Sequence, residues 1–155
     1  MPSIPEAAPR LHAEDLTAAD AESVLAFLTP RLHAQMVEHH GAPGYRTAFA
    51  VDAIARGAAS TVRYQHQRLS EDDFYDSRDK GRCLTDLKDA WNVLWQAAFP
   101  WREEEGYDTA RWRHVEYTTA QQAERGEAMK AESAAEYVAT NRANKAVAPV
   151  EQTGR

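Results

Sequence analysis

The stretch Leu84–Ala98, LTDLKDAWNVLWQAA, determines the fold class of this chain. Its main apolar residues recur at steps of three and four positions, which is the spacing of one α-helical face: Leu84, Leu87, Trp91, Leu94 and Ala98. Trp95 and Phe99 widen this apolar stripe, and the polar residues fall on the other side. We therefore predict an amphipathic helix with one buried face, ended by Pro100.

A second helix is predicted upstream, over Tyr45–Leu69. Its larger apolar residues also recur at helical spacing: Phe49, Val51, Ile54, Ala58, Val62 and Leu69. Alanines and Gly57 leave little bulk in its middle, so we expect this helix to approach a neighbour closely in a bundle. Further upstream, Thr17 predicts the start of a helix and Thr29-Pro30 a second start, before a turn at Gly41–Gly44.

Downstream of Pro100 the sequence predicts a long helix that buries little of its surface. Asp108 can cap a helix over 108–143, about 50 Å in length at 1.5 Å per residue. Between Ala120 and Glu136 its apolar residues are mainly alanines and Met129, and Tyr137 and Val138 follow. We expect this helix to pack only partly on the core and to project or pair with another chain.

These patterns together predict an all-α fold, a bundle of four to five helices with a long C-terminal helix and an extended N-terminal arm. Prolines at positions 2, 5 and 9 favour an extended arm over residues 1–15. The helical core would cover 16–107, the long helix 108–143 and a flexible tail 144–155. We find no internal repeat and no strand pattern.

Composition and charge exclude several classes of protein. The net charge of −6 would repel phosphates, which makes nucleic-acid binding through Arg56 and Arg63 the third of our hypotheses. The alternative for these arginines is pairing with the acidic segment that follows them. The single cysteine, Cys83, allows no internal disulfide and is expected to be a buried apolar filler. We find neither a signal peptide nor an apolar run long enough for a membrane span, and we expect a cytoplasmic protein.

The segment Ser70–Trp91 holds seven carboxylates and includes Asp72-Asp73-Phe74-Tyr75-Asp76. These five residues resemble the aspartate-rich motif of prenyl-diphosphate and terpene synthases, and the resemblance implies Mg²⁺ ligands. If Gly81 turns a helical hairpin, a wider ligand set would converge: Asp72, Asp73, Asp76, Asp86 and Asp89. A continuous helix through Ser70–Arg82 is the other possibility.

The paired acidic helices also resemble nucleotide pyrophosphatases of the MazG type. That family carries E-E-x-x-E and E-x-x-D, whereas this chain carries D-D-x-x-D and D-x-x-D, with shorter side chains. A structural interpretation competes with both resemblances. Asp86 and Asp89 each lie two residues from a member of the apolar stripe, so they should point away from the core into water.

Aromatic residues are dense between Trp91 and Trp112, and they exceed what one narrow helix face can bury. We predict that several of them bind a protein partner, together with exposed residues of the last helix and the two arginines: Trp95, Trp101, Tyr107, Trp112, Met129, Tyr137, Val138, Arg56 and Arg63. In the alternative, Trp112 folds back onto Trp95 and Phe99.

The sequence therefore favours a non-enzymatic helical interaction or assembly component without a cofactor. It would self-associate into a homo-oligomer or serve as a small subunit of a larger bacterial or phage complex. The alternative is a Mg²⁺-dependent all-α enzyme that acts on a diphosphate or nucleotide through the aspartates. The third hypothesis is a nucleic-acid-binding accessory protein.

Overall fold

The computed structural model describes residues 9–147, and within this range the fold is all-α, as predicted. The helices are α1 (Ala18–Glu38), α2 (Pro43–Glu71), α3 (Ser77–Ala98) and α4 (Ala120–Val147), with 3-10 helices η1 (Ala13–Asp15) and η2 (Phe99–Trp101). Residues 1–8 of the predicted arm and 148–155 of the predicted tail lie outside the described residues. The chain divides after Thr119 into two units.

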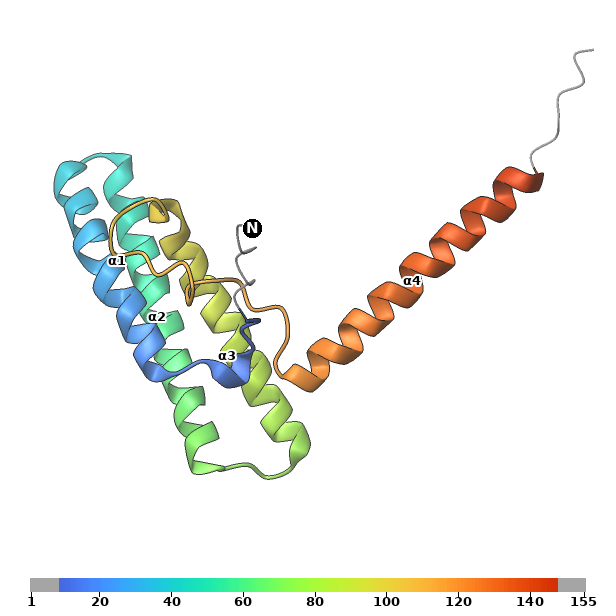
Figure 1. Cartoon of the computed structure of the whole chain (residues 1–155). Helices are drawn as coiled ribbons and strands as arrows, with labels where there is room; N and C mark the ends of the chain where they lie inside the picture. The colour runs from blue at the N-terminus through green and yellow to red at the C-terminus, as the bar shows by residue number, and fades with distance from the viewer. Residues whose placement is uncertain (1–8, 148–155) are drawn as a thin grey trace, which may run out of the picture. The chain divides into compact units, whose positions relative to one another are not determined.

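In the first unit α1, α2 and α3 lie side by side, and α2 packs along both of the others (Figure 1). The core is formed by facing side chains of the three helices, with Trp91 of α3 as its largest fully buried residue. The stripe predicted on α3 is confirmed, because all five of its members are buried. Burial of a large apolar side chain stabilises a fold by about 1.5–3 kcal/mol, so this stripe carries much of the stability.

Helix α2 confirms the second predicted helix and part of its predicted face, since Val62 is buried and Val51, Ala58 and Leu69 pack against the core. The other two predicted members are exposed. Phe49 and Ile54 are 54% and 57% exposed. The buried residues are smaller or polar and recur at steps of four and three: Ala48, Asp52, Ala55, Ala59 and Val62. Small residues let α2 come close to two neighbours at once. The free energy gained from this close packing outweighs what burial of the bulkier side chains would contribute. Large apolar groups are consequently left on the surface of α2.

The prediction of a second helix start at Thr29-Pro30 is wrong, because Pro30 lies inside α1, which is one continuous helix. A proline in a helix interior costs about 3 kcal/mol, because it removes a hydrogen bond and crowds the preceding turn. Leu28 and Leu32, on either side of Pro30, are both buried in the same core. Their burial offsets the cost of the proline and keeps the helix unbroken.

The predicted helix over 108–143 is wrong at its start, because α4 begins only at Ala120. Residues 102–119 instead run back over the bundle without forming a long helix (Figure 1). Trp112 and Val115 in this return segment are buried in the core. The Asn92 side chain holds the backbone of Val115 through two hydrogen bonds of 2.8 and 2.9 Å, so the segment gains backbone partners without becoming helical.

The second unit consists of α4, a helix of 28 residues. Every side chain from Ala131 to Val147 is exposed, including those of Tyr137 and Val138. The long C-terminal helix is thus confirmed, with bounds that differ from the predicted ones. Its predicted partial packing on the core stays a prediction.

Candidate functional site

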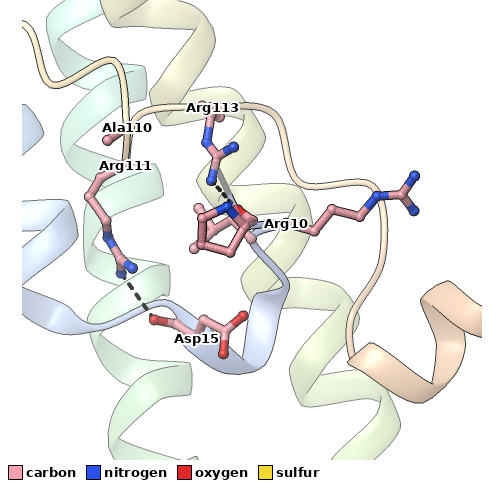
Figure 2. A pocket seen from close by; sticks show the side chains of 7 residues that line it. Arg10, Asp15, Ala110, Arg111 and Arg113 are labelled. Atoms are coloured by element: carbon pink, nitrogen blue, oxygen red, sulfur yellow. Dashed lines mark hydrogen bonds between the residues drawn. The ribbon is translucent and has the colours of Figure 1, made fainter. Parts of the chain in front are cut away.

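A cavity of about 530 Å³ lies between the beginning of the described chain and the return segment. Three arginines and an aspartate contribute to its lining: Arg10, Arg111, Arg113 and Asp15. Figure 2 shows Arg111 turned toward the chain at Asp15, while Arg10 extends away from it. The guanidinium groups of Arg111 and Arg113 are directed at other parts of the protein.

Arg111 binds Asp20 of α1 with two hydrogen bonds, of 2.5 and 3.1 Å, and donates a third to the carbonyl of Asp15. Partial burial acts to raise the pKa of Asp20. The hydrogen bonds from Arg111 and from the Thr17 backbone N–H outweigh that effect and hold this pKa below its ordinary value. The Arg111–Asp20 pair therefore fastens the return segment to the start of α1.

Arg113 donates a hydrogen bond of 2.7 Å to the carbonyl of Pro9. Its Nε atom and the Nε2 atom of His12 are buried without a hydrogen-bond partner, and both residues line a smaller cavity of about 200 Å³. Asp15 lines the larger cavity and Glu116 lines the smaller one, and each carboxylate reduces the positive potential there. We interpret Arg111 and Arg113 as residues that hold segments of the chain together rather than as a binding site for an anion.

The acidic segment does not form the hairpin that we considered. The turn falls before Gly81, at residues 72–76, and Gly81 lies inside α3. Asp72 ends α2 in a left-handed conformation, with φ of 48°. Asp76 caps α3 by accepting a hydrogen bond of 2.8 Å from the Asp79 N–H. These two aspartates thus have structural roles at helix ends.

Nor do the five aspartates of the Mg²⁺ hypothesis come together. Among residues 9–147, no group of three or more His, Cys, Asp or Glu side chains is placed to hold a metal ion. Asp86 and Asp89 are exposed on α3, pointing into water as the stripe predicts, and Asp73 is exposed in the turn. The helix-end roles of Asp72 and Asp76 keep them apart from that pair, so the ligand set required for a diphosphate site is not assembled.

The exposed faces of α2 and α3 form a groove, with a volume of about 440 Å³. It is lined by small and apolar residues and by two carboxylates: Ile54, Gly57, Ala58, Thr61, Asp86, Asp89, Ala90 and Val93. The ammonium of Lys88 lies 3.9 Å from Asp89, a weak surface pair. We call this surface the α2–α3 groove.

Gly57 is exposed in the wall of this groove. A Cβ atom placed on Gly57 would meet no atom within 4 Å. Packing of α2 inside its own bundle therefore does not require a glycine here. The missing side chain instead leaves room on the outer surface, where another helix could approach closely.

The predicted partner-binding aromatics divide into two groups. Trp112 is only 5% exposed and packs edge-on against Phe27 and Tyr107, so it has little surface left for a partner and its predicted role stays a prediction. Trp95, Trp101 and Tyr107 are half-buried against the core. They keep some surface for a partner, but most of their packing lies within the protein.

Arg56 and Arg63, the two arginines predicted to bind a partner, both lie on α2. Arg56 pairs with Asp52, one turn earlier on α2, and not with the acidic segment. Arg68 makes that contact instead, with its guanidinium 2.8 Å from Asp79. Asp52 is buried to 98% and was missed by the sequence reasoning, although its four-residue spacing from Arg56 was a usable signal. Arg63 is half-buried on the same helix.

Cys83 is fully buried, with its sulfur 3.5 Å from the carbonyl oxygen of Gln65. Burial raises the pKa of its thiol, which keeps it protonated and unreactive. The prediction of a buried filler is confirmed.

The partner-binding residues predicted on α4 are all on the surface. Met129 and Tyr137 are 68% and 69% exposed, and Val138 is exposed as well. Together with the α2–α3 groove, they are surfaces that a partner could contact.

Comparison with known proteins yields no match among protein families, curated proteins or solved structures. Within residues 9–147, none of the helices has both the length and the apolar character that crossing a membrane requires.

Proposed function

We propose that this chain is a non-enzymatic helical assembly component that associates with copies of itself. The observation that supports the proposal most strongly is α4, a 28-residue helix whose side chains are exposed throughout Ala131–Val147. Tyr137 and Val138 are among them, and both are of types that anchor protein interfaces or pack in cores.

An isolated helix has little to keep it folded. Its alanines favour the helical backbone, and the ion pair between Glu127 and Lys130, 3.7 Å apart, adds only a few tenths of a kcal/mol. Helices in proteins gain most of their stability from packing one face against another element. A partner that covers α4 would supply that packing.

The first unit offers a complementary surface. Phe49, Ile54 and Tyr64 of α2 are each more than half exposed, and Ile54 lines the α2–α3 groove. Exposed apolar groups beside a groove are typical of surfaces that bind protein. Each copy would thus carry both a helix that lacks packing and a groove that a helix can enter.

The competing hypotheses have weaker support. The aspartates of the Mg²⁺ hypothesis lie apart, and Arg56 of the nucleic-acid hypothesis is engaged by Asp52. The single buried thiol of Cys83 suits a reducing compartment, so the proposal includes a cytoplasmic location. Membership of a larger bacterial or phage complex stays a prediction from the sequence.

Light scattering of the purified full chain at rising concentration tests the proposal. We expect the mass to rise above 17.4 kDa, the mass of one chain, as concentration increases. Millimolar Mg²⁺ should leave the curve unchanged. A mass that stays at one chain up to about 100 μM, which corresponds to a dissociation constant weaker than that of most stable dimers, would refute self-association.

A further inference from the structure

The α2–α3 groove places demands on what can fill it. Its lining is apolar at Ile54 on α2 and Val93 on α3, and the carboxylates of Asp86 and Asp89 lie one to two turns toward the start of α3. An occupant must therefore offer apolar contact at one end and positive charge at the other. A helix with both features on one face would satisfy the groove.

The C-terminal half of α4 has this composition. Residues 137–147, YVATNRANKAV, contain no acidic residue and two basic ones, Arg142 and Lys145. These bases lie four and seven residues after Val138, on the same helix face. All three side chains are exposed. This face of α4 is apolar at one end and cationic at the other.

The spacing on the two helices matches when they run in opposite directions. Along α3 the residues Asp86, Asp89 and Val93 are separated by three and then four positions. Backwards along α4, Lys145, Arg142 and Val138 are separated by the same three and four. At 1.5 Å per residue both sets span about 10 Å, so each aspartate can meet a base while the two valines meet each other.

We propose that the C-terminal half of α4 from a second copy lies antiparallel to α3 in the α2–α3 groove. This inference rests on the proposed self-association and specifies its interface. Asp86 faces Lys145, Asp89 faces Arg142 and Val93 faces Val138. The open space at Gly57 receives side chains of the incoming helix. In a two-fold symmetric dimer the contact forms twice, once in each groove.

The covalent connection explains why a second copy must supply the helix. With Val138 beside Val93, a straight α4 places Ala120 about 27 Å away along the axis of α3. Within one chain, Val115 is held at Asn92, next to Val93, by two hydrogen bonds. The five residues from Val115 to Ala120 extend at most about 18 Å. A chain therefore cannot place its own α4 in its own groove in this register.

Paired charge reversals in the full chain test the proposal. Asp86→Lys with Asp89→Lys makes the groove positive, and Arg142→Glu with Lys145→Glu makes the helix negative. Each double variant alone should dimerise at least about tenfold more weakly than the wild type, because two attractive pairs become repulsive in both grooves. An equimolar mixture of the two variants should recover near wild-type association, since both contacts of the mixed dimer are again complementary.

The control for net charge is Arg125→Glu with Lys130→Glu. It makes the same change of charge as Arg142→Glu with Lys145→Glu, but in the N-terminal half of α4. This variant should associate like the wild type. Sedimentation velocity would measure the association of the wild type, of the three double variants and of the mixture. Variants that associate like the wild type would overturn the proposal and leave self-association intact. A mixture no better than either variant alone would also overturn it. Self-association itself fails only if the wild type is monomeric.

A second variant tests the groove without a change in charge. Gly57→Leu should fill the groove and weaken dimerisation at least about tenfold, since a bulky side chain would exclude the incoming helix. The fold should persist, because the new Cβ meets no atom within 4 Å. Gly81→Leu is the matched control, at an equally open glycine on α3 outside the groove, and should dimerise normally. Equal dimerisation of the two variants would overturn the proposal.

Discussion

At the scale of single residues, the Asp20–Arg111 pair joins two segments that lie 91 positions apart in the sequence. Because the folded state lowers the pKa of Asp20, this pair stabilises the protein fully above the unfolded value of about 3.9 and loses its contribution as the pH falls through the lower folded value. Asp20→Asn should therefore cost about 1–3 kcal/mol at neutral pH and less in acid. Urea unfolding from pH 7 to pH 3 measures this difference.

The control for Asp20→Asn is Glu22→Gln, which makes the same carboxylate-to-amide change on the exposed side of α1. It should leave stability nearly unchanged at neutral pH. If the cost of Asp20→Asn were constant between pH 7 and pH 3, the ion pair would not be the cause.

Two variants of Asp76 distinguish a helix-capping role of this residue from a metal-binding role. Asp76→Ala should lower the free energy of unfolding by about 1 kcal/mol, because the hydrogen bond to the Asp79 N–H is lost from the start of α3. Asp76→Ser retains a capping oxygen but lacks a carboxylate, so its stability should stay close to that of the wild type. Thermal unfolding should rank the stabilities of the wild type and the two variants in the same order with millimolar Mg²⁺ and with a chelator. Stabilisation of the wild type alone by Mg²⁺ would revive the metal hypothesis.

A substitution at Gly57 tests whether the packing of α2 within the monomer requires a glycine at this position. Gly57→Ala should raise the free energy of unfolding by about 0.5–1 kcal/mol, because alanine favours the helix and its Cβ has room. Gly44→Ala is the contrasting variant, since its Cβ would lie 2.8 Å from Cγ of His39 and force that side chain to move. Chemical denaturation should rank Gly57→Ala above Gly44→Ala. The reverse order would show that Gly57 is needed inside the monomer.

Local spacing predicted some of these residue roles and not others. The outward direction of Asp86 and Asp89 followed from their offset from the α3 stripe, because helix geometry alone fixes it. The partnership of Asp20 with Arg111 depends on how the return segment crosses the bundle. No local pattern encodes that crossing.

At the scale of elements, the helices were more predictable than their buried faces. On α3 large apolar residues mark the buried side, so periodicity identified it. On α2 the buried side consists mainly of alanines with Val62 and Asp52, while Phe49 and Ile54 stay exposed. A helix that packs closely against two neighbours selects small residues, and hydrophobicity alone then assigns some exposed bulky residues to the buried face.

Residues 108–119 of the return segment were wrongly predicted as helix, because their backbone partners are distant in sequence. The Asn92 side chain supplies two of them, and η1 supplies another through the 3.0 Å hydrogen bond from the Glu14 N–H to the Thr118 carbonyl. Such contacts satisfy an extended backbone in place of helical hydrogen bonds.

Asn92→Ala tests how strongly that segment is held. It should lower the free energy of unfolding by about 2 kcal/mol, because the buried N–H and C=O of Val115 lose their partners. Gln96→Ala, one turn later on the exposed side of α3, should change little. Urea denaturation of both variants makes the comparison. Equal stability of the two would mean that Asn92 does not hold the segment.

At the scale of the whole molecule, the proposed assembly depends on surfaces that the chain leaves without packing. After Ala120 the sequence favours helix but contains few large apolar side chains, and this composition correctly predicted an exposed helix. The α2–α3 groove was not predicted, because it forms only once the bulky residues of α2 are excluded from the core. The identity of a partner follows from matching two surfaces, which requires the structure.

Removal of α4 should separate folding from association. The buried cluster that forms the core lies entirely within residues 13–115, so a chain ending at Thr119 should unfold cooperatively with nearly the stability of the full chain. It should lack association, since the helix that fills the groove is gone.

The most direct measurement is therefore sedimentation equilibrium of the full chain and of the chain ending at Thr119 at the same concentrations. The full chain should approach twice its 17.4 kDa monomer mass, whereas the shortened chain should remain a monomer. A full chain that stays monomeric, or a shortened chain that associates equally well, would contradict assembly through α4.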